Sequence, residues 1–69
     1  MNASTTQKAS YKGHEIVATV HMTVEGWVPV ATIDGATCKM FQIPHMDRED
    51  AYGRAFRTAR DTIDHDEYR

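Results

Sequence analysis

VHMTVEGWVPVATIDGATC, residues 20–38, decides the fold, because it places two glycine turns nine residues apart between runs rich in β-branched residues. The turns are Glu25-Gly26 and Asp34-Gly35. An Asp-Gly pair between such runs is a strong hairpin signal, since a two-residue type I′ turn needs positive φ at both central positions and glycine adopts it without steric cost. The stretch therefore predicts three antiparallel strands that follow one another along the chain.

The predicted strands cover residues 14–24, 27–33 and 36–43, and Pro44, which lacks a backbone N–H, ends the last of them. Two-residue turns place Val24 opposite Trp27 and Ile33 opposite Ala36. One face of the sheet is then almost wholly apolar and is the expected core. It carries Ile16, Ala18, Val20, Met22, Val24, Trp27, Pro29, Ala31, Ile33, Cys38 and Met40.

After Asp47 the spacing of apolar residues becomes helical, with Tyr52, Ala55, Phe56, Ala59 and Ile63 on one stripe. Asp47 is a suitable N-cap, and acidic residues follow it in the first turn. The expected fold is α+β: a three-stranded antiparallel meander in the order 1-2-3, with one C-terminal helix packed on one face. Residues 11–69 form this single domain. Residues 1–10 are polar and rich in Ser and Thr, which predicts a disordered arm.

The opposite face of the predicted sheet is mixed, and no second helix is available to cover it. It would expose an apolar patch of Val28, Val30, Phe41 and Ile43, with His21 and Lys39 at its polar border. Exposed apolar patches are typical of partner surfaces. A β-bulge in the third strand is the alternative, since it would turn Phe41 and Ile43 into the core. We therefore expect a protein-interaction module that self-associates, as a homodimer, through this face or through an edge strand.

Length and composition favour the same function. A chain of 69 residues is a single small domain, and one of that size buries only about 60% of its unfolded surface, so a partner would add stability. The lone Cys38 excludes an internal disulfide and fits a reducing compartment. Neither an apolar leader nor a membrane-spanning run is visible, so we expect a cytoplasmic protein without a membrane partner. A formal net charge of −2 argues against a generic nucleic-acid binder.

No residue pattern predicts catalysis, a metal or a cofactor. The four histidines, His14, His21, His45 and His65, lack metal-ligand spacing and are joined by no second cysteine. The carboxylates of Glu15 and Asp34 near a sheet end are read as solubilising. The expected protein is therefore not an enzyme.

The predicted helix carries three arginines that could form a basic stripe for phosphate. Each of them has an acidic residue four positions away on the same helix, which predicts ion pairs that neutralise the stripe. The predicted pairs are Arg54 with Asp50, Arg57 with Asp61 and Arg60 with Asp64.

YKGHEIVATVHMTVEGWVPVATI at 11–33, followed by DREDAYGRAFRTARDTID at 47–64, resembles a group of short proteobacterial proteins of unknown function. The shared motifs are Tyr-x-Gly-x-x-Ile, an aromatic-x-Pro second strand and a helix with Ala-Arg-x-x-Ile-Asp, and they imply no activity. A looser resemblance is to HicB-type antitoxins, whose β-β-β-α unit ends in a similar alanine-containing helix. It would imply an antitoxin or a nucleic-acid-linked regulator. The Pro-Gly-Cys loop of that family is not found after the second predicted strand.

Overall fold

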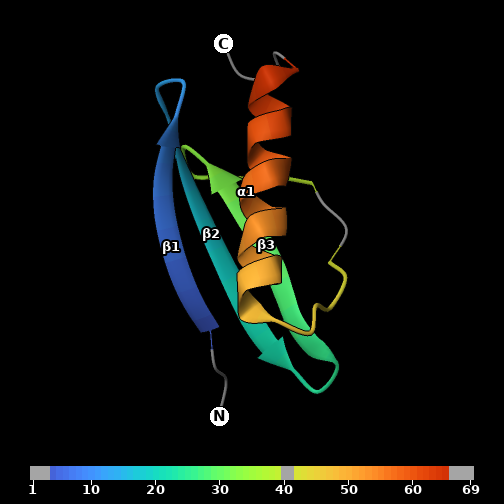
Figure 1. Cartoon of the computed structure of the whole chain (residues 1–69). Helices are drawn as coiled ribbons and strands as arrows, with labels where there is room; N and C mark the ends of the chain where they lie inside the picture. Colours follow the sequence, from blue (N-terminus) through green and yellow to red (C-terminus); the bar gives the residue numbers. More distant parts are fainter. Residues whose placement is uncertain (1–3, 40–41, 66–69) are drawn as a thin grey trace.

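The computed structural model describes residues 4–39 and 42–65. In this part of the chain a four-stranded antiparallel sheet, in the order β1-β2-β3-β4, carries one helix on one face (Figure 1). The elements are β1 (Ser4–Tyr11), β2 (His14–Thr23), β3 (Gly26–Ile33), β4 (Ala36–Thr37) and α1 (Arg48–Asp64). The α+β class with a single covering helix is confirmed, and the expectation of three strands is wrong.

The additional strand is β1, which lies in the stretch whose composition predicts a disordered arm. It pairs with β2 along its full length, from Ser4 opposite His21 to Tyr11 opposite His14. Lys12 and Gly13 join the two strands with φ of 51° and 82°, as a two-residue type I′ turn requires. Composition misses β1 because backbone hydrogen bonds hold the strand in place, while most of its side chains stay exposed.

The hairpin between β2 and β3 turns one residue earlier than predicted. Thr23 pairs with Gly26, and Met22, not Val24, lies opposite Trp27. The turn residues are therefore Val24 and Glu25, and Val24 is fully exposed. The pairing differs from the predicted register by two positions, and side chains alternate with a period of two, so every strand residue keeps its predicted face.

The hairpin between β3 and β4 has the predicted turn but a much shorter final strand. Asp34 and Gly35 have φ of 50° and 89°, and Ile33 pairs with Ala36 as expected. The predicted strand 36–43 is wrong in length, because β4 ends at Thr37. The chain later returns to β3 at His45, which forms an isolated bridge with Trp27.

Helix α1 begins and ends close to the predicted positions, and Glu49 and Asp50 lie in its first turn. Asp47 is in the N-cap position with extended backbone, but its side chain makes no capping hydrogen bond. At the other end, the backbone N–H of His65 donates to the carbonyl oxygen of Asp61 over 3.0 Å. The N-terminus of the helix therefore lacks a side-chain cap, whereas its C-terminus has a backbone contact.

The core lies between α1 and the predicted apolar face of β2 and β3. Several of its members are alanines with no exposed surface, which lets the helix backbone approach the sheet closely. Met22 is 56% exposed although it is on the core face, because the β2–β3 hairpin extends past the start of α1 (Figure 1). The buried hydrophobic residues are Ile16, Ala18, Val20, Ala31, Ile33, Cys38, Ala51, Tyr52, Ala55, Ala59 and Ile63.

Candidate interaction surface

The face of the sheet opposite α1 has no covering element in the described part of the chain. The strand register places His21 beside Val28 and Thr19 beside Val30, so both valines of the predicted patch lie here, half-buried. Threonine side chains surround them, and Thr6 and Thr19 share a hydrogen bond of 3.2 Å between their hydroxyl oxygens. This open face is therefore a mixture of valine and threonine and is less apolar than the sequence predicts.

The other predicted patch residues lie outside the strands. Lys39 and Ile43 follow β4 in a segment without regular structure, and both are exposed, Ile43 by 53%. Phe41 lies outside the described residues. The strands thus bring together His21, Val28 and Val30, and the predicted role of this set at an interface stays a prediction.

The outer edge of β3 is closed against a further strand. Trp27 and His45 exchange two backbone hydrogen bonds of 2.8 Å, and the N–H of Cys38 donates to the carbonyl of Ala31 over 2.8 Å. Pro29 lies between these two contacts and has no N–H to offer at this edge. The outer edge of β3 is therefore occupied by later residues of the same chain and by Pro29.

No described strand pairs with the outer edge of β1. Within the described residues β1 is the terminal strand of the sheet, and it contains no proline and one charged residue, Lys8. Native proteins usually protect a long edge strand with charges, prolines, bulges or a covering segment. In the eight residues of β1, the charge of Lys8 is the one protective feature of this kind.

The backbone groups that point outward from β1 follow from the alternation of an antiparallel ladder. The carbonyl of Glu15 accepts the N–H of Asp34, so Glu15 faces the β3 side and its neighbour Ile16 faces β1. Ile16 pairs with Ala9, so Ala9 bonds inward to β2 and alternate residues bond outward. The outward N–H and C=O groups of β1 therefore belong to Ser4, Thr6, Lys8 and Ser10.

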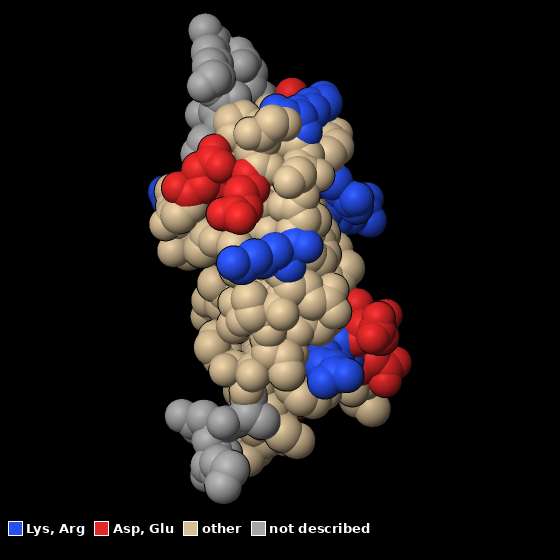
Figure 2. Space-filling view, turned by 90° about the vertical axis from the view of Figure 1, so that its left-hand side faces the viewer, with Lys and Arg blue, Asp and Glu red and all other residues tan. Residues whose placement is uncertain are grey.

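The surface on the β1 side is largely uncharged, and its charged side chains lie in small separate groups (Figure 2). Such a surface suits the pairing of two strands that carry one charge each better than the binding of a polyanion.

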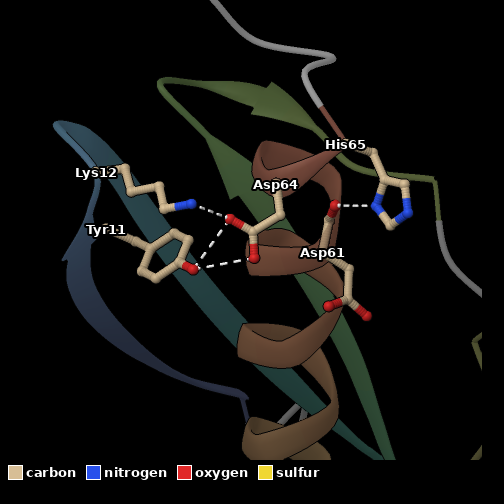
Figure 3. A network of polar contacts seen from close by, with 5 residues as sticks. All are labelled: Tyr11, Lys12, Asp61, Asp64 and His65. Carbon is tan, nitrogen blue, oxygen red and sulfur yellow. Dashed lines mark hydrogen bonds and ion pairs between the residues drawn. The ribbon is translucent and has the colours of Figure 1, made fainter.

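Two polar clusters fix the ends of the hairpins. Lys12 Nζ donates to Asp64 Oδ1 over 2.5 Å, and the Tyr11 hydroxyl lies 3.0 Å from both oxygens of the same carboxylate (Figure 3). The hydrogen bond from Lys12, followed by that from Tyr11, lowers the pKa of Asp64. The contact with Asp64 raises the pKa of Lys12. The cluster joins the β1–β2 turn to the last turn of α1, which is a structural role.

The second cluster holds the β3–β4 turn against β2. His14 Nδ1 lies 2.7 Å from Asp34 Oδ2, and the N–H of Glu15 donates to Asp34 Oδ1 over 2.9 Å. The contact with His14, followed by that with the Glu15 N–H, lowers the pKa of Asp34. A histidine beside a carboxylate can also act as an acid–base pair, but here both contacts of Asp34 tie the start of β2 to the β3–β4 turn. The pair is best explained as a turn anchor.

The remaining histidines take no part in the hydrogen bonds of Asp34 and Asp64 described above. His21 is on the open face, His45 pairs with Trp27 through its backbone, and His65 Nδ1 lies 2.7 Å from the carbonyl oxygen of Asp61 at the helix end. Across residues 4–39 and 42–65, His, Cys, Asp and Glu side chains do not gather in groups of three or more that could hold a metal ion. Cys38 is buried, and this burial raises the pKa of its thiol.

The predicted ion pairs of the helix arginines are wrong for the described residues. The ion pairs found there join Lys12 to Asp64 and His14 to Asp34, so Asp64 is engaged by the β1–β2 turn and not by Arg60. An exposed ion pair gains little free energy, so helical spacing alone does not secure it. An open groove of about 370 Å³ remains beside the helix, lined by His45, Asp50, Gly53, Arg54 and Arg57.

The β1 edge was missed by sequence reasoning. Its one local signal is Lys12-Gly13 between two runs without proline, which is a weaker hairpin signal than Asp34-Gly35, because lysine adopts positive φ less readily than aspartate. β1 lacks the alternation of apolar and polar residues that identifies β2 and β3. It needs no such pattern, because only Thr5 and Tyr11 are partly buried.

In the described residues, no helix has both the length and the apolar character required to cross a membrane. Comparison with known proteins returns no matching family model, no matching curated protein and no matching solved structure.

Proposed function

We propose that this protein is a small protein-interaction module of the cytoplasm that self-associates by pairing its β1 edge with that of a second copy. The observation that carries the proposal is the difference between the two edges of the sheet. The β3 edge is occupied by Pro29 and the returning chain, whereas β1 presents eight residues of regular, almost uncharged strand.

Strand addition at an open edge is a recurrent mode of protein recognition, in which backbone hydrogen bonds supply affinity. A second copy is the partner that best suits β1, since an antiparallel strand can pair with itself about a two-fold axis. Small domains also gain most from added burial. The open face of valine and threonine would continue across the two copies and enlarge the surface available to further partners.

The proposal is tested by light scattering on the full chain over a range of concentrations, with Lys8→Pro as the critical variant. The Lys8 N–H points outward, so proline removes a donor of the proposed interface without removing a bond to β2. Lys8→Gln is the matched control, because it removes the charge and keeps the N–H. We expect the wild type and Lys8→Gln to dimerise and Lys8→Pro to be a folded monomer.

A monomeric wild type at the highest concentration would overturn the proposal. So would a Lys8→Pro variant that dimerises as strongly as the wild type. Circular dichroism of Lys8→Pro separates loss of the dimer from loss of the fold.

A second candidate function, recognition of an anionic or phosphate-bearing partner, rests on the groove beside α1. Arg54 and Arg57 line it, and neither forms an ion pair within the described residues. Guanidinium groups recognise carboxylate and phosphate by paired hydrogen bonds. The test is RNA binding at increasing salt: a steep decrease, reduced in Arg54→Gln/Arg57→Gln, supports this candidate, and binding that is absent at low salt rejects it.

A further inference from the structure

We infer that the two β1 strands pair in one register, with Gln7 on the two-fold axis and Thr6 of each copy opposite Lys8 of the other. The inference rests on the proposed function, since it specifies the geometry of that self-association. It follows from the direction of the backbone groups, the extent of β1 and the position of its single charge.

The symmetric registers of β1 are limited by its outward backbone groups. These belong to Ser4, Thr6, Lys8 and Ser10, and an antiparallel pair forms hydrogen bonds only where outward groups of both strands meet. A two-fold axis can therefore pass through a pair of Gln7 residues, a pair of Lys8 residues or a pair of Thr6 residues while keeping most of the strand paired.

The register centred on Gln7 forms the most hydrogen bonds. Ser4 then meets Ser10 and Thr6 meets Lys8, each twice by symmetry, and since each such pair exchanges two bonds the total is about eight. Among the described residues, centring on Lys8 or on Thr6 leaves one outward residue of each β1 without a strand partner, which reduces the total to about six. The length of β1, Ser4–Tyr11, therefore favours the axis at Gln7.

Charge favours the same register. Like charges directly opposite each other on neighbouring strands are destabilising. The register centred on Lys8 places two lysines face to face, whereas the register centred on Gln7 places each Lys8 opposite Thr6. Lys8 is the single charged residue of β1, so no acidic residue of that strand could compensate two facing lysines.

The position of α1 leaves room for this pairing. The helix packs against β2 and β3, and β1 extends beyond it at the side of the sheet (Figure 1). A two-fold axis at an antiparallel strand pair runs perpendicular to the sheet, so both helices lie on the same side of one continuous sheet. The Gln7 side chains point to that side too, since Gln7 pairs with Ala18 of the core face.

The experiment is disulfide cross-linking of single cysteine variants of the full chain, run beside light scattering. Residues on the axis at Gln7 form a non-hydrogen-bonded pair with Cα atoms about 4.5 Å apart, within the range that a disulfide spans. The variants are Gln7→Cys, Thr6→Cys and Lys8→Cys. The wild type serves as control, because its own Cys38 is buried.

We expect Gln7→Cys to form a cross-linked dimer at least about tenfold faster than Thr6→Cys or Lys8→Cys alone, because only its thiols meet at high effective concentration. A mixture of Thr6→Cys and Lys8→Cys should form the mixed dimer faster than either variant forms its own.

Faster cross-linking of Lys8→Cys or Thr6→Cys alone would overturn the register and leave edge pairing in place. Dimers by light scattering without cross-links at any of the three positions would place the interface away from β1, and would overturn both this inference and the proposed pairing of β1 edges. Monomers by light scattering at all concentrations would overturn the proposed function itself.

Discussion

Gly26 and His45 approach so closely that a side chain on Gly26 has no space: a Cβ atom built there would lie 2.6 Å from the carbonyl oxygen of His45. That carbonyl accepts the N–H of Trp27 over 2.8 Å, so it cannot move away without breaking the bridge that closes the β3 edge. Gly26 also has φ of 137°, a conformation that other residues rarely adopt.

We expect Gly26→Ala to destabilise the protein by about 1–3 kcal/mol from backbone strain, with the contact at His45 adding to it. Gly53→Ala is the matched control, since a Cβ at that helical position meets nothing within 4 Å. It should stabilise the protein by about 1 kcal/mol, the helix-propensity difference. Urea unfolding measures both changes, and an equal effect of the two substitutions would contradict this reading of Gly26.

The hydroxyl groups of Thr5 and Tyr52 form a hydrogen bond that connects β1 to the helix. Tyr52→Phe should cost about 1 kcal/mol, the usual net contribution of such a bond. Thr5→Val keeps the shape of its side chain and leaves the buried Tyr52 hydroxyl without this partner. In a double-mutant cycle by urea unfolding, the double variant should lose less stability than the sum of the two single variants, whereas additive effects would show that the contact contributes nothing.

Acid should destabilise the fold through Asp34 and Asp64. Both carboxylates have pKa values below the ordinary 3.8, because hydrogen bonds stabilise their charged forms in the folded state. Their contribution is therefore present above the unfolded pKa and is lost as the pH falls through the lower folded value. Thermal unfolding measured from pH 7 to pH 2 should show the melting temperature decreasing below about pH 4.

Asp34→Asn and Asp64→Asn should weaken this pH dependence. Asparagine tolerates the left-handed conformation of residue 34, so Asp34→Asn keeps the turn while it removes the charge. An unchanged pH profile in both variants would contradict the assigned role of these carboxylates.

The thiol of Cys38 should react slowly in the folded protein. It is 6% exposed, and burial raises its pKa, so little thiolate is available at neutral pH. Reaction with a chromogenic disulfide reagent should accelerate on addition of denaturant. A rate in the folded protein equal to that in the unfolded chain would contradict the burial of this side chain.

The parts of the fold that were predictable are those with a local cause. Alternating apolar residues identify the core faces of β2 and β3, helical spacing identifies α1, and Asp34-Gly35 marks its turn by its own conformational preference. Each of these signals is contained within a few neighbouring residues.

The parts that were missed depend on residues far away in the sequence. β1 has no apolar pattern and is held by its ladder to β2, so composition alone indicates an arm. The Glu25-Gly26 pattern predicts a turn position for Gly26, but the residue that requires glycine there is His45, nineteen positions later, which pairs with Trp27. Helical spacing predicts an ion pair of Asp64 with Arg60, but Asp64 instead accepts hydrogen bonds from Lys12 and Tyr11. The candidate interaction edge exists only because β1 pairs with β2, and this long-range pairing has no signal in the local sequence.

Pro29 limits the growth of this sheet by strand addition. A growing fibre needs every copy to accept a neighbour on both flanks, and the flank at Pro29 offers no donor at its centre. Growth by strand addition would therefore stop at a dimer. Such a dimer would have no open edge, among the described strands, for the unlimited strand stacking of amyloid fibrils.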